Sequence, residues 1–178
     1  EGHDFAGWEP SIPNNMPAED ITVKATWDVL SYEVTWDVDG KTTTETLEYG
    51  EEIDTPKDPT KEGYTFTGWK DADGNDVPAT MPAQNITLDA SLTKNTYNAI
   101  FYLDEEKTEV YTTVPTLYGE AIEFPEDPDI PGKEFAGWML ETELPEDWAD
   151  EGVMCHYDME FVAELYDIEY FINILDED

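Results

Sequence analysis

The 178-residue chain is predicted to form a mainly β fold, an elongated array of small tandem repeat domains with little helix. Three observations predict this fold: a motif that occurs three times, apolar strands that follow it at a fixed distance, and Pro-rich segments between strands. The motif is Phe-x-Gly-Trp, at 5–8, 66–69 and 135–138. Self-similarity with a period of about 60–75 residues is typical of an array of small domains.

Two strands are expected after each motif. A Met follows the Trp, and a segment then alternates apolar and polar residues with strict period two, which is typical of a half-buried strand. A Tyr opens a second alternating strand five residues later in every copy. The first set of strands lies at Ile21–Trp27, Ile86–Leu92 and Met159–Leu165, and the second set begins at Tyr32, Tyr97 and Tyr170.

The remaining segments predict turns and crossovers. Asp39-Gly40 indicates a hairpin turn, because Gly accepts the positive φ of tight turns. The returning strand ends in Tyr-Gly-Glu, at 49–51 and 118–120, and a Pro-rich crossover follows, at 55–59 and 124–128. Prolines this dense exclude more than a turn of helix. The distance from the motif Trp to the Met grows from 8 to 12 to 16 residues, which indicates an exposed loop on a fixed scaffold.

These boundaries divide the chain into four parts. Residues 1–28 are the C-terminal half of a first repeat, 29–94 a second repeat and 95–167 a third repeat. Residues 168–178 are the first strand of a further repeat, or a strand that completes a permuted unit. Since the first part begins inside a repeat, the chain is expected to be a segment of a longer protein.

The charge excludes several classes of function. The chain carries 44 acidic and 8 basic residues, a net charge of -36, with 39% hydrophobic and 13% aromatic residues. Nucleic-acid binding needs clustered cations, so no nucleic-acid partner is expected. No apolar run has the length of a membrane span, so no membrane insertion is expected. The aromatic content and the patterning predict folded cores despite the charge, and the lone Cys155 excludes an intramolecular disulfide.

The sequence predicts no catalytic, metal or cofactor site. His3 and His156 are the only histidines and lie in different repeats. Cys155 and His156 are adjacent, so on a strand they would point to opposite faces, and we expect them in a surface loop or at a strand edge. The oxygen-rich segment 71–76 lacks the further ligands of an EF-hand and is interpreted as a hairpin turn. The alternatives are a defined calcium site there or weak calcium uptake by the whole acidic surface.

The tryptophans raise the question of ligand binding. Trp8, Trp69 and Trp138 occupy one position of every copy, as packing residues do, and we expect a structural role for them. Trp148 lies in the longest and most acidic loop, 141–152, and is the candidate ligand contact. The alternative for Trp148 is partial burial under its own loop.

The chain resembles the Listeria-Bacteroides repeat, or internalin B-repeat, family. The residues that carry the resemblance are Tyr-Gly-Glu at 49–51, the segment Pro59–Trp69 and Met-Pro-Ala at 81–83. The resemblance implies a β-grasp-like fold in extracellular, often cell-wall-attached, multi-domain bacterial proteins, where such repeats act as spacers or contribute to adhesion. The third copy departs from the pattern, with Lys133 in place of Tyr64 and Cys155-His156 in place of Pro82-Ala83.

The predicted function is a non-catalytic stalk or spacer with an adhesion-related role, extracellular or on the bacterial cell surface. The alternative is a glycan- or protein-binding module that uses loop 141–152. The expected partner is a host or bacterial-surface protein or a glycan. Weak head-to-tail self-association through the terminal half-repeats is a further expectation.

Overall fold

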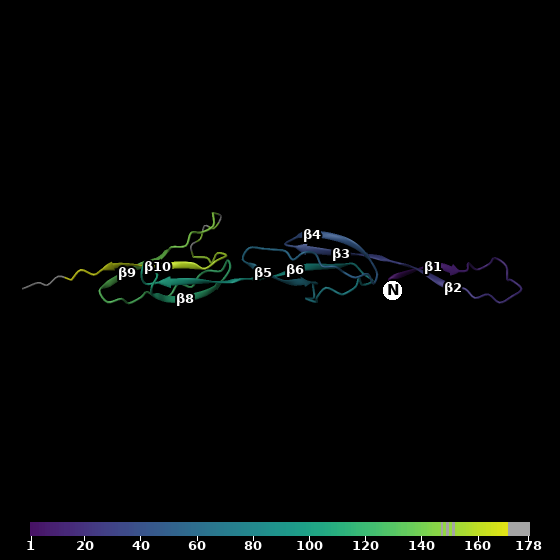
Figure 1. Ribbon diagram of the computed structural model, residues 1–178, viewed down its shortest axis with the longest axis horizontal. Coiled ribbons are helices and arrows are strands. Elements are labelled where there is room, and N and C mark those ends of the chain that lie inside the picture. The colour runs from purple at the N-terminus through teal and green to yellow at the C-terminus, as the bar shows by residue number, and fades with distance from the viewer. Residues whose placement is uncertain (147, 149, 151, 171–178) are drawn as a thin grey trace, which may run out of the picture. The chain divides into compact units, whose positions relative to one another are not determined.

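The computed structural model describes residues 1–146, 148, 150 and 152–170. Among these residues the structure contains ten strands and no helix, which confirms the mainly β prediction (Figure 1). The chain divides into two compact units. Unit 1 comprises 1–60 and 66–93, and unit 2 comprises 61–65 and 94–178.

Two sheets belong mainly to unit 1. A two-stranded antiparallel sheet joins β1 and β2, and a four-stranded sheet has the order β4-β3-β6-β5. In the second sheet the central pair, β3 and β6, runs parallel, and β4 flanks β3 in the antiparallel direction. The strands are β1 (His3–Glu9), β2 (Lys24–Val29), β3 (Ser31–Val38), β4 (Lys41–Glu48), β5 (Tyr64–Lys70) and β6 (Ile86–Lys94).

Unit 2 repeats the four-stranded plan. Its sheet has the order β8-β7-β10-β9, again with a parallel central pair, β7 and β10, and antiparallel outer strands. The strands are β7 (Thr96–Tyr102), β8 (Val110–Leu117), β9 (Lys133–Leu140) and β10 (Met159–Asp167). The predicted strands at 32–38, 86–92, 97–103 and 159–165 correspond to β3, β6, β7 and β10. Most of the strand predicted from residue 170 lies outside the described residues.

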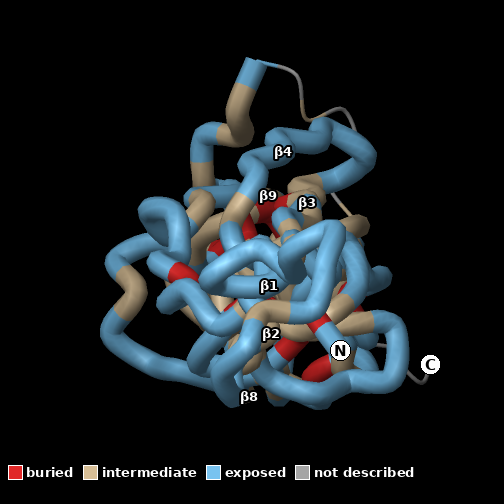
Figure 2. Tube along the Cα trace, turned by 90° about the vertical axis from the view of Figure 1, so that its right-hand side faces the viewer, coloured by how far each residue is buried: buried red, intermediate tan, exposed pale blue. Residues whose placement is uncertain are grey.

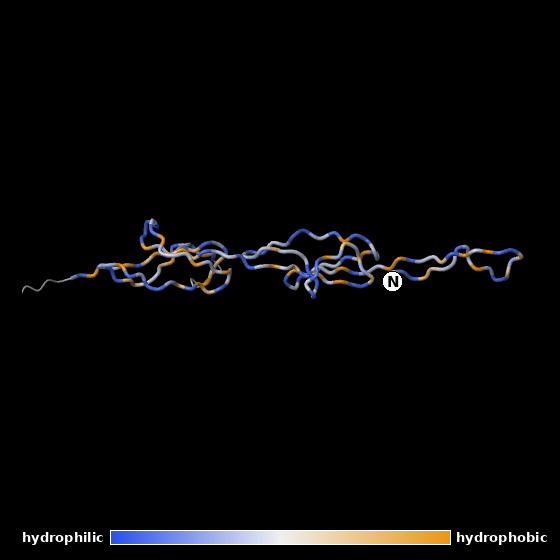
Figure 3. Tube along the Cα trace, turned by 90° about the horizontal axis from the view of Figure 1, so that it is seen from below, coloured by the Kyte–Doolittle hydropathy of each residue, from blue (hydrophilic) through white to orange (hydrophobic). Residues whose placement is uncertain are grey.

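Each four-stranded sheet has a small core on one face, formed by the residues that alternate along its central strands. Buried residues occur only in short runs of the trace (Figure 2), and hydrophobic and hydrophilic residues alternate over short distances (Figure 3). The core of unit 1 consists of Val34, Trp36, Ile53, Trp69, Met81 and Leu88. The core of unit 2 consists of Ala99, Phe101, Ile122, Met154, Cys155, Met159 and Phe161.

The two-stranded sheet leaves its apolar side chains open. Phe5 is 50% exposed, Trp27 57% and Met16 92%, whereas Met81, at the equivalent repeat position, is 1% exposed. In the four-stranded sheet of unit 1, β3 contributes Trp36 to cover the corresponding face. In that of unit 2, β7 contributes Phe101. Among the described residues, no third strand pairs with the two-stranded sheet.

A bulge explains the Phe-x-Gly-Trp motif. Residues three apart on a regular strand point to opposite faces, yet the rings of Phe5 and Trp8 lie 5.4 Å apart. The register shifts between Phe5 and Gly7, so one extra residue brings both rings to one face. Gly7 has φ +151°, a region that L residues rarely adopt, so the position requires Gly. The same edge-on ring pair recurs as Phe66 with Trp69 and Phe135 with Trp138.

A second recurring arrangement, which we call the Tyr-Gly joint, occurs once in each unit. In unit 2, a Cβ at Gly63 would meet the Tyr118 ring at 2.4 Å, so the ring lies directly on the glycine backbone. Asn95 donates its N–H to the carbonyl of Gly63 (2.8 Å) and accepts the N–H of Tyr118 (2.9 Å). The neighbouring Tyr64 ring meets Tyr118 edge-on at 5.6 Å. A short segment of chain is thus fixed by two backbone hydrogen bonds, the ring on the glycine and an edge-on ring contact.

The joint of unit 1 has the same construction. A Cβ at Gly2 would meet the Tyr49 ring at 2.2 Å, and the His3 ring meets Tyr49 edge-on at 5.5 Å. Leu30 donates to the Gly2 carbonyl (2.9 Å) and accepts the N–H of Tyr49 (2.8 Å). The Tyr of Tyr-Gly-Glu therefore has one structural role in both units.

The Gly and Glu of Tyr-Gly-Glu bind the Met that follows the motif loop. Gly50 donates to the Met81 carbonyl (2.9 Å), and Met81 donates to the Glu51 carbonyl (2.7 Å). Gly119, Met154 and Glu120 repeat both bonds in unit 2, at 2.8 and 2.9 Å. These bonds close the core beneath the buried Met, and they explain why the two sequence signals occur together in a repeat.

Candidate functional site

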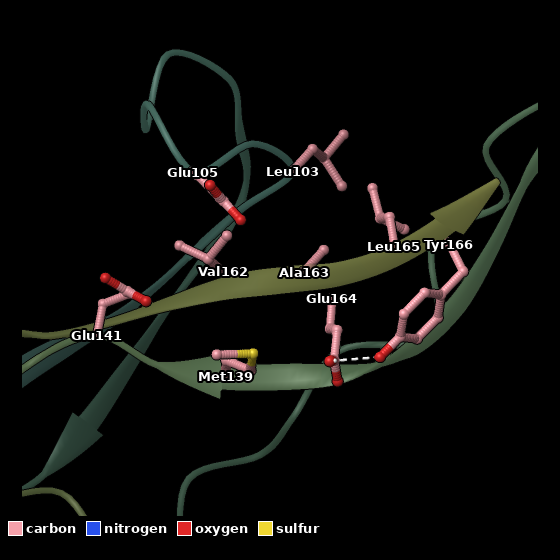
Figure 4. A pocket seen from close by; sticks show the side chains of 9 residues that line it. All are labelled: Leu103, Glu105, Met139, Glu141, Val162, Ala163, Glu164, Leu165 and Tyr166. Atoms are coloured by element: carbon pink, nitrogen blue, oxygen red, sulfur yellow. Dashed lines mark hydrogen bonds between the residues drawn. The ribbon is translucent and has the colours of Figure 1, made fainter.

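A groove of about 470 Å³ opens at the end of the sheet of unit 2 (Figure 4). Strands β9 and β10 and the loop after β7 line it. Its apolar lining consists of Leu103, Met139, Val162, Ala163 and Leu165, and three carboxylates lie around it, from Glu105, Glu141 and Glu164.

The groove exists because β7 ends before β10 does. The parallel ladder of β7 and β10 stops at the pair Tyr102 and Val162, whereas β10 continues to Asp167. After Tyr102 the chain leaves the sheet in the loop 103–109. On the side where β7 pairs with its first half, the second half of β10 therefore borders the groove.

The carboxylate of Asp104 holds the loop 103–109 in place. It accepts the backbone N–H of Thr108 (2.9 Å) and that of Glu109 (2.7 Å). These hydrogen bonds stabilise the charged form and lower the pKa of Asp104 below its usual value of 3.8. Lys107 adopts φ +55° within the loop.

The outward face of this sheet differs in chemistry from that of unit 1. Val162, which is 4% exposed, stands where β6 carries Asp89. Met139 of β9 stands where β5 carries Lys70, and Tyr102 of β7 stands where β3 carries Asp37. The same fold thus presents a charged outer face in unit 1 and a partly apolar one in unit 2.

Hydrogen bonds and an ion pair order the surroundings of the groove. Lys107 Nζ lies 2.6 Å from Glu160, which raises the pKa of Lys107. Burial is the main cause that raises the pKa of the neighbouring Tyr102. On the other side, the Tyr166 hydroxyl donates to Glu164 (2.7 Å), which raises the pKa of Tyr166. Glu160 is compensated by Lys107, so the charge facing the groove comes from Glu105, Glu141 and Glu164.

Trp148 lies partly buried beside the core of unit 2. Its indole Nε1 donates to the Val153 carbonyl (3.1 Å), and its ring lies 5.4 Å from that of Tyr118. Val153 and Tyr118 lie outside loop 141–152, and the intermediate exposure leaves part of the ring accessible. Its role as a ligand contact remains a prediction. Residues 147, 149 and 151 of its loop lie outside the described part of the chain.

The expectation for Cys155 was wrong. A surface loop or strand edge was expected, but Cys155 has no exposed surface and belongs to the core of unit 2. Burial raises the pKa of its thiol, so the protonated form is favoured. The neighbouring His156 points elsewhere, and its Nδ1 lies 2.8 Å from Glu62 of the same unit. The adjacent residues are therefore not brought together as a nucleophile and a base.

The segment 71–76 forms a hydrogen-bonded turn. Asp71 Oδ1 accepts the N–H of Asp73 (3.0 Å) and that of Asn75 (2.8 Å), and Gly74 takes φ +83°. Lys70 pairs with Asp76 at 2.6 Å. In the part of the chain that the structure describes, no three His, Cys, Asp or Glu side chains converge as metal ligands do.

The three motif tryptophans share a position but not an environment. Trp69 is 5% exposed and meets Trp36 edge-on, and Trp138 meets Phe101 in the same way, both at 5.0 Å. Trp8 is 43% exposed on the two-stranded sheet. The packing role is therefore found in both cores. Within the described residues, the buried Nε1 atoms of Trp69 and Trp138 have no hydrogen-bond acceptor.

The groove was not predicted from the sequence. One signal could have indicated it: the apolar Val162 and Met139 occupy strand positions whose counterparts, Asp89 and Lys70, are charged. On a sheet with one solvent-exposed face, the residues of that face are usually polar, so an apolar residue there departs from the usual pattern.

A comparison with protein families finds two matches in this chain. The model of the Listeria-Bacteroides repeat domain matches residues 32–91 and 97–164. These ranges lie within the predicted second and third repeats, and each contains one four-stranded sheet almost completely.

Curated relatives include proteins of two bacteria. Internalin H of Listeria monocytogenes serovar 1/2a is 43% identical over 109 residues, which is 53% of this chain and 20% of that protein. A putative Gly-rich membrane protein of Evansella cellulosilytica is 28% identical over 83% of this chain and 19% of its own length. A putative membrane protein of the same organism is 27% identical over 99% of this chain and 29% of its own length. The chain therefore spans less than a third of the relatives it matches. Across the described residues, none of the elements is a helix with the length and apolarity to cross a membrane.

Proposed function

The chain belongs to the Listeria-Bacteroides repeat family, and from that premise we propose that it is a non-catalytic spacer segment of a larger bacterial surface protein. The proposed location is extracellular, with attachment to the cell wall, and the proposed role of the whole protein is adhesion-related. The similarity to internalin H of Listeria monocytogenes supports the surface location.

The Tyr-Gly joint is the observation that carries the spacer proposal. Both units contain it with the same two backbone bonds and the same ring on glycine. Within each unit, the backbone hydrogen bonds and the edge-on rings fix a short stretch of chain that a linker of flexible residues would leave free. The recurrence of this arrangement in both units supports a regular structural role for the repeats.

Small-angle X-ray scattering of the chain tests the spacer proposal. A compact domain of this length would have a radius of gyration of about 16 Å, and a spacer should give a clearly larger value. The Tyr118→Ala variant should broaden the distribution of pair distances, because it removes the ring from Gly63. Tyr111→Ala, which removes a Tyr near the start of β8, serves as the control. A compact value for the unmodified chain would contradict the proposal.

The same experiment reports self-association. A concentration series would show head-to-tail contacts as a growing apparent mass, and the exposed Phe5 and Trp27 are candidate contacts.

The surface location needs a separate test: an antibody against this chain should bind intact producing cells, and binding only after lysis would contradict it.

A binding module that uses loop 141–152 is the second candidate function. The partly accessible Trp148 ring beside Tyr118 supports it, because aromatic rings with one polar edge are common in binding sites. The proposed partner is a glycan or a host or bacterial-surface protein. In a screen against glycans and matrix proteins, a signal that Trp148→Ala abolishes would favour this function over a pure spacer.

A further inference from the structure

We propose that the groove of unit 2 binds an extended peptide segment of another protein, in which basic and apolar side chains alternate. Among the described residues, this site shares Glu141 with loop 141–152 but does not include Trp148, and it adds a binding role that does not depend on the spacer proposal. The argument rests on the strand edge, the lining and the charge of the groove.

The strand edge favours an extended ligand. The ladder of β7 and β10 ends at Tyr102 and Val162, and β10 runs on to Asp167 beside the groove. Peptides bind such places by adding a short strand, with backbone bonds for affinity and alternate side chains for specificity. Ala163 and Leu165 of β10 line the groove beyond the last pair of that ladder.

The lining favours alternating apolar and basic side chains. Leu103, Met139 and Leu165 offer an apolar surface, and burial of apolar side chains there would remove it from water. Lys and Arg side chains pack their aliphatic stems on apolar surface while the charged end reaches outward. Glu105, Glu141 and Glu164 stand where such ends would arrive (Figure 4). Charge-assisted hydrogen bonds to carboxylates are among the strongest that proteins form.

The charge of the chain excludes a second copy as the favoured occupant. With a net charge of -36, another copy would bring carboxylates toward carboxylates. A basic partner would instead be attracted over several ångströms before contact. The outward face of unit 1, with Asp37, Lys70 and Asp89 at the equivalent positions, lacks the apolar surface and should not compete for the peptide.

Three blocked eight-residue peptides serve as probes in isothermal titration of the whole chain. The first alternates Lys and Val, the second Lys and Ser, and the third Glu and Val. The Lys-Val peptide should bind in 150 mM NaCl. The Lys-Ser peptide keeps the charge but lacks the apolar side chains, and the Glu-Val peptide reverses the charge. Both should bind at least about tenfold more weakly.

Two charge-matched double variants locate the binding. Met139→Lys with Glu164→Ser installs the residues that unit 1 carries at these positions, Lys70 and Ser91, so the fold should tolerate them. Leu117→Lys with Asp127→Ser makes the same change of charge at exposed positions away from the groove. Unfolding midpoints of both variants verify that each remains folded.

The groove variant should lose at least about tenfold in affinity for the Lys-Val peptide, and the control variant less than about twofold. Equal binding to both variants would overturn the proposal, because it would assign the binding to the acidic surface as a whole. Equal binding of the Lys-Val and Lys-Ser peptides would overturn it as well. Failure of the spacer test would leave these results unaffected, so the two proposals fail separately.

Discussion

Glycines in this chain meet two different constraints, backbone conformation and close packing. Gly63 and Gly119 both take positive φ, at +75° and +70°. A Cβ at Gly63 would meet the Tyr118 ring at 2.4 Å, whereas a Cβ at Gly119 would meet nothing within 4 Å. The pair therefore separates the cost of conformation from the cost of lost packing.

We predict that Gly63→Ala destabilises unit 2 more than Gly119→Ala does. The left-handed conformation alone should cost about 1–2 kcal/mol, which is the expected effect at Gly119. At Gly63 the Tyr118 ring must also move, so the loss should exceed that value. Urea denaturation followed by Trp fluorescence measures both. Adding Tyr118→Ala to Gly63→Ala should lower the extra cost, and equal losses for the two single variants would contradict the packing argument.

At the scale of elements, short polar turns join the strands, while the order of the strands in the sheet depends on contacts outside the turns. The turn 71–76 between β5 and β6 depends on one carboxylate, that of Asp71, which accepts bonds from Asp73 and Asn75. Its hydrogen bonds with Asn75 are the main cause that lowers the pKa of Asp71 below 3.8. The folded state therefore binds this proton less tightly than the unfolded chain does.

We predict that Asp71→Ala lowers the urea midpoint at pH 7 and that the difference from the unmodified chain disappears at low pH. Because the pKa is lowered on folding, the contribution of Asp71 is present above pH 3.8 and is lost as pH falls through the folded value. Asp73→Ala removes the same charge from the same turn while keeping the Asp71 bonds, and it should have a smaller effect at pH 7. The urea midpoints of Asp71→Ala and of the unmodified chain are measured at pH 7 and at pH 2. A difference between the two proteins that has the same size at both pH values would refute the assignment.

At the scale of the molecule, self-repulsion opposes folding. The net charge of -36 is distributed over small cores, and the ion pairs, such as Lys70 with Asp76 and Lys107 with Glu160, compensate only a few carboxylates. Exposed pairs contribute about 0–1 kcal/mol each. Salt screens both the repulsion between carboxylates and the attraction within ion pairs. Because acidic residues far outnumber basic ones, the repulsion is the larger effect.

We predict that the thermal unfolding midpoint rises when NaCl increases from 10 to 150 mM. The Debye length falls from about 30 Å to about 8 Å over this range, so repulsion between distant carboxylates weakens most. Calorimetry measures the midpoint. A CaCl₂ series at matched ionic strength distinguishes screening from calcium uptake, which would raise the midpoint further. A midpoint that falls with NaCl would mean that the ion pairs outweigh the repulsion.

Much of the fold could be predicted because its signals are local. Alternation of side chains along a strand follows from backbone geometry, and so β3, β6, β7 and β10 agree with the period-two pattern. The Asp39-Gly40 turn is local in the same sense, and Val38 does pair with Lys41 across it. Cys155 shows the limit, since burial in a loop depends on neighbours that no local pattern specifies.

The sequence by itself determined the repeats, the strands, the turns and the family, because each is written in residue types at short and regular spacing. Only the tertiary structure decided that the central strands run parallel, that a Tyr ring lies on a Gly more than fifty residues away in unit 2, and that a groove opens where β7 ends before β10. These features depend on which distant segments become neighbours. That choice follows from packing the whole sheet, and no single stretch of the chain carries it.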